Sequence, residues 1–454
     1  MSVATTTLET TASSTNYACE ICALRFDRKK QLTEHLAGKR HREAVAAASE
    51  HWAAFQRGSW QEPSLTLEEQ EAIVTRAWSL AEFVVDLPSR SRSEGSGIAP
   101  HVTLSSLAPQ RRLMLWRYLR ELMPSRPLLP EVFAELERNH GRYARVKELL
   151  ESTMVFQHVE QAILRSDPST VLKRGKVHVT AGRSYLPRTR KLLDVACGHG
   201  LVGLLVAYRF PQVEVLGIDR TQRPAYSAFV DAWRTAHLAS QSGAAAADRA
   251  GGASASAPLA TTLGASVSDA SSSMPGAEVD GAPLSNIRFV EGEFADLAED
   301  EGAGAGEDGG FVDERTLVLC VHGCNEVNVE AATMAKRTGA SWLLVPCCLR
   351  TDLYLDVDSI RLPDESHYAF LCGSMATQYG ASRVATVDAR VTPRSIVLSG
   401  GEAPSPSREA VAAAAARLTA HGKVSSLRPA RGGGAHAHRP GQHQLPVPGA
   451  GRPK

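Results

Sequence analysis

The stretch from Lys191 to Arg220 constrains the fold more than any other part of the 454-residue chain. An apolar run, Leu192–Ala196, ends in Cys-Gly-His-Gly at 197–200 and continues into an apolar segment of helical length. Glycines at such a turn let the backbone approach a ligand closely. A second apolar run ends at Asp219, where a carboxylate can accept hydrogen bonds from both hydroxyls of a ribose. The stretch therefore predicts a strand, a turn, a helix and a second strand around a nucleoside-binding site.

Predicted strands and helices alternate over the second half of the chain. Further strands are predicted at 287–290, 316–321 and 342–345, with helical stretches between several of them. Such alternation favours a parallel sheet with helices packed on it. The last two strands, 384–391 and 395–399, are predicted to form a hairpin around a proline-containing turn. We therefore expect an α/β fold whose parallel sheet carries an antiparallel C-terminal hairpin.

The glycine turn differs from a dinucleotide-binding fingerprint. Gly198, Gly200 and Gly203 have the required spacing, but the lead-in Asp-Val-Ala-Cys-Gly does not fit it. The segment instead resembles motif I of class I S-adenosylmethionine-dependent methyltransferases, and Asp219 resembles their ribose-binding acid. This resemblance covers about 184–400 and implies a Rossmann-like methyltransferase sheet with S-adenosylmethionine as cofactor. A nucleotide-binding α/β domain of another kind, such as a dehydrogenase, is the alternative.

The resemblance also assigns residues to the cofactor. The turn after the first strand would contact its methionine part, Asp219 its ribose, and an acid after the third strand its adenine. The cofactor-binding residues implied are Asp194, Ala196, Cys197, Gly198, His199, Gly200, Asp219 and Glu293, with Asp296 close to Glu293 in the sequence.

Reactive side chains follow the predicted fourth and fifth strands. Ligands of parallel α/β sheets bind beyond the carboxyl ends of the strands, so His322, Cys347 and Cys348 are candidate catalytic residues. His322 could remove a proton from a hydroxyl nucleophile, and Cys347 or Cys348 could attack a pyrimidine ring. Alternatively, these two cysteines could bind a second metal ion together with Cys324 and Cys372, or all four could be buried core residues.

The two clusters, His-Gly-Cys at 322–324 and Pro-Cys-Cys at 346–348, are distantly similar to a branch that includes tRNA 2′-O-methyltransferases. Those relatives carry a His-Leu-Cys-Gly turn and a later Cys-Cys-His cluster, whereas Leu349 follows Cys348 here. The similarity implies an RNA substrate, with tRNA as one candidate.

A compact metal-binding pattern lies near the N-terminus. Cys19, Cys22, His35 and His41 have the spacing Cys-x2-Cys-x12-His-x5-His. Two thiolates on a hairpin and two imidazoles on a following helix can close a tetrahedral Zn²⁺ site, which would supply the folding energy of so small a unit. The pattern resembles fingers of the matrin and double-stranded-RNA-binding type, which implies binding to RNA or to a protein.

Composition divides the remainder of the chain. We expect disorder at 1–16, the zinc finger at 17–43, a helical region at 44–165, the methyltransferase domain at 184–400 and a basic low-complexity tail at 401–454. An Ala/Ser/Gly-rich insertion at 236–285 is predicted to be disordered, because it has too little apolar surface to offset its ordering entropy. Two basic groups also occur: Lys173, Arg174, Lys176, Arg183, Arg188, Arg190 and Lys191 could contact phosphates, and Arg111, Arg112, Arg117 and Arg120 are predicted to form a solvated helix face.

These features favour an S-adenosylmethionine-dependent methyltransferase that acts on RNA with help from the finger. The alternatives are a non-catalytic RNA-binding protein with a degenerate methyltransferase fold, or a methyltransferase for proteins or small molecules. Either the finger or the tail could also bind a partner protein. Apolar windows are too short for a membrane helix, no signal peptide is recognised, and the eight cysteines suggest no disulfide framework. We therefore expect an intracellular protein, with the nucleus favoured over the cytoplasm.

Overall fold

The computed structural model describes residues 17–85, 87–89, 97–124, 126, 128–165, 170–173, 176–179, 188–251, 284–294, 296, 311–324, 326–355 and 361–401. The segments predicted to be disordered at 1–16 and to form a tail at 401–454 lie outside these residues, apart from Gly401. None of the described helices is long and apolar enough to cross a membrane.

The N-terminal module pairs β1 (Tyr17–Cys19) with β2 (Leu24–Phe26) as an antiparallel hairpin. Two helices follow, α1 (Lys29–Ala37) and α2 (Lys39–Arg57), where a single helix carrying both histidines is expected. Gly38, whose backbone is extended at φ −74° and ψ 154°, separates them. Glycine is among the weakest helix formers, so the x5 gap between the histidines contains a helix break.

The region predicted to be helical contains α3 (Leu67–Thr75), α4 (Leu80–Val84), α5 (Pro109–Leu122), α6 (Leu129–His140) and α7 (Val146–Arg165). Short 3₁₀ turns lie at Leu104–Ser106 and Gly141–Tyr143. The prediction of a solvated arginine face on α5 is wrong. Arg112 is only 18% exposed and pairs with Glu62 and Glu137, while Arg117 donates to the carbonyls of Val74 and Arg76. These arginines connect α5 to neighbouring segments.

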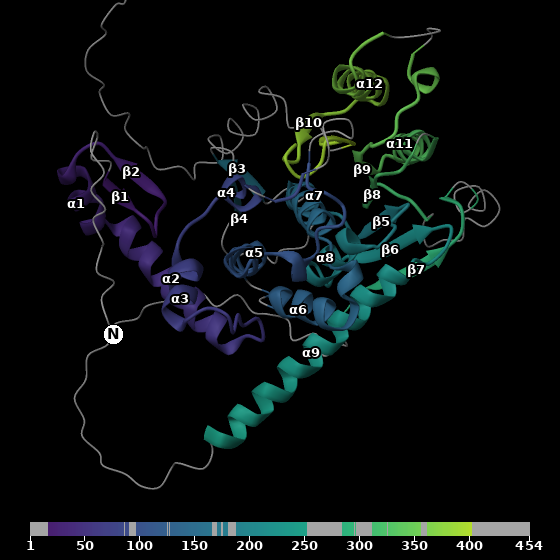
Figure 1. The fold of residues 1–454 in the computed structure, drawn as a ribbon. Coiled ribbons are helices and arrows are strands. Elements are labelled where there is room, and N and C mark those ends of the chain that lie inside the picture. Colours follow the sequence, from purple (N-terminus) through teal and green to yellow (C-terminus); the bar gives the residue numbers. More distant parts are fainter. Residues whose placement is uncertain are drawn as a thin grey trace, which may run out of the picture. The chain divides into compact units, whose positions relative to one another are not determined.

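The central sheet has seven strands: β5 (Lys191–Val195), β6 (Glu214–Asp219), β7 (Ile287–Glu291), β8 (Thr316–Val321), β9 (Ser341–Val345), β10 (Arg383–Thr386) and β11 (Ile396–Gly400). They lie in the order β10-β11-β9-β8-β5-β6-β7 (Figure 1). The run from β9 to β7 is parallel, whereas β11 is antiparallel to both β9 and β10. This arrangement confirms the expected Rossmann-like α/β sheet, parallel with an antiparallel C-terminal hairpin.

Helices cover both faces of the sheet. Side chains of successive strand residues point to opposite faces, so each strand contributes to two separate cores. Leu192, Leu317 and Leu343 pack in one core with α7, α8 (Leu201–Arg209) and α9 (Pro224–Gly251). Their neighbours Leu193, Val318 and Leu344 pack in a second core with α11 (Glu326–Thr338) and α12 (Asp364–Tyr379). A separate antiparallel pair, β3 (Thr170–Lys173) and β4 (Lys176–Val179), follows α7.

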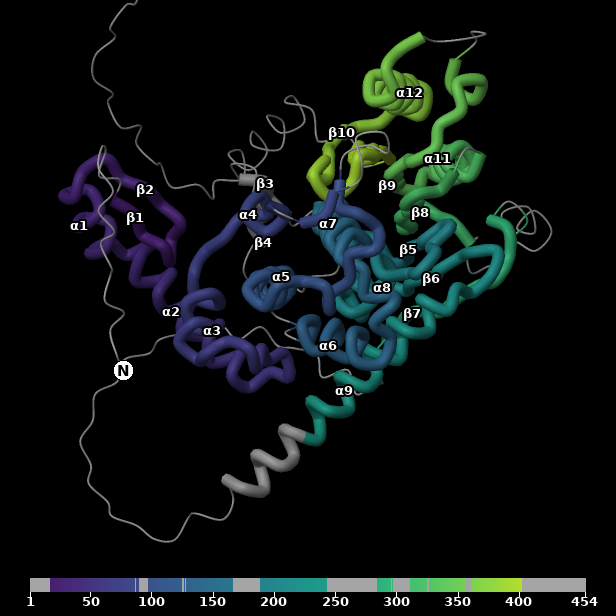
Figure 2. The backbone as a smooth tube through the Cα atoms, in the orientation of Figure 1, coloured from purple at the N-terminus to yellow at the C-terminus, as the bar shows by residue number. Residues whose placement is uncertain are grey.

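The prediction that disorder begins at residue 236 is wrong. Helix α9 (Pro224–Gly251) continues past residue 236, and Figure 2 shows the coloured part of its tube leading away from the sheet. Its first half is anchored by Trp233 and Ala236, which are buried. The alanines at 244–247 have the highest intrinsic helix propensity of any residue, which favours continuation of the helix. Residues 252–283 of the insertion lie outside the described part of the chain.

Candidate functional site

The turn after β5 is shaped by three left-handed residues. Ala196, Gly198 and Gly200 have φ values of +54°, +59° and +66°. A β-carbon on Gly200 would lie 2.4 Å from the ring of Tyr226, so a side chain does not fit there. Gly200 is also the residue from which α8 starts, and its N–H donates to the carbonyl of Cys197 at 2.8 Å. The turn therefore exposes backbone at the carboxyl edge of the sheet.

Asp219, at the end of β6, is fixed against this turn. Its Oδ2 accepts from the backbone N–H of Gly198, and its Oδ1 from that of Arg220, both at 2.8 Å. A carboxylate offers about four lone-pair sites, so each oxygen retains capacity for a ligand hydroxyl. The predicted ribose acid and the predicted methionine-binding turn are thus in direct contact.

Asp194 lies beneath the turn and is 2% exposed. Its Oδ2 accepts from the N–H of Gly203 in α8 at 3.2 Å. Burial, together with the nearby charge of Asp219, raises the pKa of Asp194 to about 7, although the Gly203 hydrogen bond acts in the opposite direction. Asp194 therefore fastens the first turn of α8 to β5, and its charge state changes near neutral pH.

A cavity of about 770 Å³ opens at this edge of the sheet. That volume lies in the usual range for small-molecule sites. Of the predicted cofactor residues, Gly200 packs against Tyr226 and is not in the wall. The other seven, together with Asp296, line the cavity: Asp194, Ala196, Cys197, Gly198, His199, Asp219 and Glu293. The exposed backbone of the turn and the unused hydrogen-bond acceptor sites of Asp219 fit the amino-acid and nucleoside parts of S-adenosylmethionine.

Two further cavity residues differ in their surroundings. Glu293 pairs with Arg220 at 2.5 Å, and both side chains are largely exposed. His199 accepts from the N–H of Leu201 through Nδ1 at 3.1 Å and lies beside the ring of Phe229. Burial lowers the pKa of His199, which favours its neutral form.

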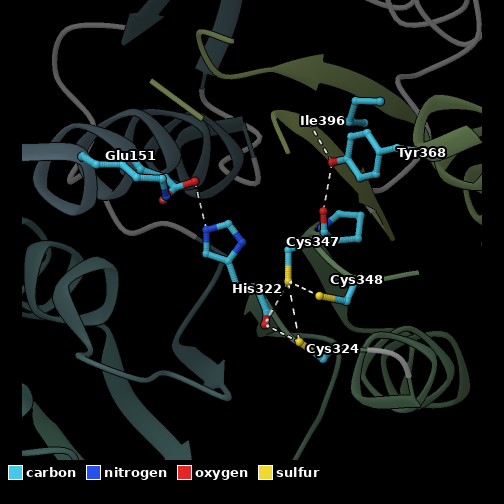
Figure 3. A network of polar contacts seen from close by, with 9 residues as sticks. Glu151, His322, Cys324, Cys347, Cys348, Tyr368 and Ile396 are labelled. Carbon is cyan, nitrogen blue, oxygen red and sulfur yellow. Dashed lines mark hydrogen bonds and ion pairs between the residues drawn. The ribbon is translucent and has the colours of Figure 1, made fainter. Parts of the chain in front are cut away.

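His322, immediately after β8, lies in the same cavity wall. Its backbone is left-handed, at φ +59°, and its N–H donates to the carbonyl of Val345 at 2.9 Å. Its Nε2 lies 3.0 Å from Oε1 of Glu151, and Figure 3 shows the imidazole directed toward that carboxylate. Both ring nitrogens are buried and neither has a hydrogen-bond partner among the described residues, so the contact with Glu151 is an ion pair by distance and not an aligned hydrogen bond. Nε2 therefore lies beside a carboxylate, and Nδ1 makes no hydrogen bond with the described residues.

Glu151 comes from α7 and was not singled out by the sequence analysis. Its side chain is 6% exposed, and its Oε2 accepts from Lys147 at 2.7 Å. Burial raises its pKa, but His322 and Lys147 outweigh this and hold it at about 2. The only sequence signal was a Lys–Glu pair four residues apart within an apolar helix. Ser152, Arg223, Glu326 and Glu330 also line the cavity without having been predicted.

Three of the four clustered cysteines come together. The Sγ of Cys347 lies 3.7 Å from that of Cys324 and 3.5 Å from that of Cys348 (Figure 3). Cys372 is not among them, because it is buried on α12 beside Tyr368. Cys324 lines the large cavity, whereas Cys347 and Cys348 line a neighbouring cavity of about 300 Å³. Of the predicted catalytic residues, His322 thus shares the large cavity with Asp219, and Cys347 and Cys348 do not.

The N-terminal Cys/His cluster fits a metal ion. One ligand atom each from Cys19, Cys22, His35 and His41 lies within 4.8 Å of all the others. His41 Nδ1 is 3.5 Å from the Sγ of Cys19 and 3.6 Å from that of Cys22. The Nε2 of His35 is buried without a hydrogen-bond partner among the described residues. Two thiols and two imidazoles are a donor set typical of Zn²⁺.

Two members of the basic run before β5 make side-chain contacts within the chain. Arg188 pairs with Glu314 at 3.5 Å, and Lys191 donates to the carbonyl of Phe311 at 3.0 Å. Arg174 and Arg183 lie outside the described residues.

No protein-family model and no curated protein matches the chain. Several solved structures match at low identity. The fibrillarin/Nop5p complex is 9% identical over 48% of this chain and 75% of that one, with a TM-score of 0.25. An O-methyltransferase family protein from Burkholderia thailandensis is 14% identical over 63% and 70%, with a TM-score of 0.24. A SAM-dependent methyltransferase from Aquifex aeolicus is 13% identical over 46% and 80%, with a TM-score of 0.22.

Proposed function

We propose that this chain transfers a methyl group from S-adenosylmethionine to a hydroxyl group of RNA, with tRNA as one candidate substrate. A single observation carries the proposal. One cavity, at the carboxyl edge of a methyltransferase-type sheet, brings the Gly198 turn and Asp219 together with the His322–Glu151 pair. The first pair suits a nucleoside donor, and the second suits proton removal from an acceptor.

The donor would be held by the residues that line this cavity. Asp219 would accept from the ribose hydroxyls, the turn at 194–199 would contact the methionine part, and Glu293 would lie near the adenine. S-adenosylmethionine supplies an electrophilic methyl group on a sulfonium. Alignment of acceptor, methyl group and sulfur contributes most to such a displacement.

His322 would act as the general base. Because Glu151 is ionised over the physiological range, it favours the tautomer whose Nε2–H faces the carboxylate. The lone pair would then be on Nδ1, the other ring nitrogen. Nδ1 would accept the proton of the attacking hydroxyl as the bond to the methyl group forms, and Glu151 would act as a positioning residue.

RNA would be bound in part by the N-terminal module, as a zinc finger of the matrin type. Between Tyr17 and Glu43 the chain has seven Lys or Arg residues against four Asp or Glu residues, and all seven basic residues are exposed. Basic side chains on a small module suit contact with phosphates. Two of the seven already pair weakly with acids on their own helices, Lys30 with Glu34 and Lys39 with Glu43.

Calorimetric titration of S-adenosylmethionine and S-adenosylhomocysteine into the full zinc-loaded chain tests donor binding. We expect binding that Asp219→Ala weakens at least tenfold, and that the exposed control Asp231→Ala leaves unchanged. Transfer of a labelled methyl group to RNA is then measured with wild-type and His322→Ala chains. Absence of donor binding would favour the non-catalytic RNA-binding alternative. Donor binding with transfer only to proteins or small molecules would favour a methyltransferase for those substrates instead of RNA.

A further inference from the structure

We propose that Cys324, Cys347 and Cys348 form a second zinc site, with three thiolate ligands and a fourth position open to an exogenous ligand. The site is separate from the finger and requires neither donor binding nor catalysis. It therefore stands independently of the proposed function.

The distances between the thiols match those around a tetrahedral zinc ion. Zn–S bonds of about 2.3 Å at tetrahedral angles place two sulfur atoms about 3.8 Å apart. The observed separations are 3.7 Å for Cys324–Cys347 and 3.5 Å for Cys347–Cys348, and all three sulfur atoms lie within 4.8 Å of one another. None of the three cysteines is in a disulfide.

The thiols converge from two separate strand ends. Cys324 lies in the loop between β8 and α11, and Cys347 and Cys348 directly follow β9 and Pro346. These strands are parallel neighbours, so their carboxyl ends meet at one edge of the sheet. The carbonyl of His322 faces the same group, at 3.7 Å from the Sγ of Cys324 and 3.6 Å from that of Cys347 (Figure 3). A bound ion would cross-link the ends of β8 and β9 beside the His322 turn.

The N-terminal cluster provides a comparison within the same chain. It brings four ligand atoms within 4.8 Å, whereas the second group has three and no further His, Cys, Asp or Glu among the described residues meets that limit. Soft thiolates select Zn²⁺ or Cu(I) over oxygen-preferring ions. Zinc with three protein ligands normally carries a water or a substrate atom in the fourth position. Cys324 lies in the wall of the large cavity, and the other two lie in the wall of the small one, so exogenous ligands have access from either side.

Metal analysis of the full chain, purified under reducing conditions, tests the site. We expect two zinc ions per chain, and one in either Cys347→Ala or the double variant Cys19→Ser/Cys22→Ser. Combining both sets of substitutions should leave none. The matched control is Cys372→Ser, which alters a buried cysteine outside the cluster and should keep two ions. Circular dichroism and donor titration of each variant show whether the fold persists.

A second measurement needs no substitution. Thiol alkylation followed by peptide mass spectrometry compares the wild-type chain before and after a zinc chelator. We expect Cys324, Cys347 and Cys348 to react at least tenfold faster after chelation, while Cys372 stays unreactive. One zinc per wild-type chain that Cys347→Ala retains would overturn the proposal, as would alkylation rates at these three residues that the chelator leaves unchanged. A Cys347–Cys348 disulfide in the reduced preparation would also overturn it. Donor titration on the same sample shows separately whether the proposed function holds.

Discussion

The Nε2 of His322 lies 3.0 Å from Oε1 of Glu151, and this contact joins the end of β8 to the second turn of α7. It crosses from the sheet to a helix that precedes the whole α/β region in the sequence. The helical region is therefore part of the cavity wall and contributes a charged group to the candidate site.

Substituting Glu151 with glutamine should lower the rate of methyl transfer by about tenfold to a hundredfold, a share of the roughly 10²–10⁴ that a general base contributes. Gln keeps the size of the side chain but removes the charge that orients the imidazole. Single-turnover transfer measures the rate of the chemical step, and donor titration measures donor affinity. We expect donor affinity to be unchanged. Glu148→Gln, on the same helix, is the control because Glu148 pairs with Arg145 at 2.9 Å. Equal rates for the two variants would exclude a positioning role for Glu151.

Asp194 should make stability depend on pH. Its pKa is raised to about 7 by burial and by Asp219, so the folded chain keeps a proton that the unfolded chain releases near pH 4. Stability from this source is greatest below about pH 4 and declines as pH rises toward 7. The free energy of unfolding of Asp194→Asn, taken relative to that of the wild type, should therefore rise by at most about 3 kcal/mol between pH 5 and pH 8. Urea unfolding at both values measures this, with Asp231→Asn as the exposed control; a constant difference would argue against the raised pKa.

Gly200→Ala should destabilise the chain by at least about 1–2 kcal/mol, because a left-handed alanine is unfavourable and its β-carbon meets Tyr226. Donor affinity should fall as well, since the turn must shift. Gly373→Ala is the opposite control. Gly373 lies within α12 with no atom near its would-be β-carbon, and alanine there should stabilise by up to about 1 kcal/mol. Thermal unfolding and donor titration report both effects, and similar behaviour of the two variants would contradict the steric argument.

Arg112→Ala should cost about 3–5 kcal/mol of folding stability, because it leaves the carboxylates of Glu62 and Glu137 without their shared partner. Arg138→Ala should cost less than about 1 kcal/mol, since Arg138 is 54% exposed in its pair with Glu135. Denaturant unfolding compares the two. A small effect of Arg112→Ala would contradict this expectation and mean that the carboxylates of Glu62 and Glu137 relax into solvent.

Cys22→Ser should weaken RNA binding by about tenfold or more at low salt, and the difference should shrink as salt rises. The donor dissociation constant should stay unchanged, because the four residues of the N-terminal Cys/His cluster do not line the large cavity. Fluorescence anisotropy with a labelled RNA hairpin measures this, alongside Cys372→Ser as the matched cysteine variant. Unaltered RNA affinity would remove the finger from substrate binding.

Local sequence patterns predicted the parts of the site that depend on local structure. The turn after β5 and Asp219 lie in one continuous segment, so spacing alone brought them together. The four-ligand cluster was predicted for the same reason. Glu151 was missed because its role depends on a tertiary contact with a strand far along the chain, which no local pattern encodes.

The corrections have similar physical origins. The number of residues between two histidines does not reveal a helix break. In the structure, the extended backbone of Gly38 separates the helix of His35 from the helix of His41. The arginines of α5 looked solvated because charged residues usually are, yet acids and carbonyls from other segments surround Arg112 and Arg117. Cys372 shares a residue type with the thiol cluster but lies on a different element.

The left-handed backbone of His322 has an energetic consequence. A non-glycine residue in that conformation costs about 1–2 kcal/mol, which glycine would avoid. His322→Gly should therefore relieve backbone strain while removing the imidazole, so part of the chain's stability is sacrificed at the position that the proposed reaction needs. At this one residue, selection for the most stable protein and selection for a working base would favour different amino acids.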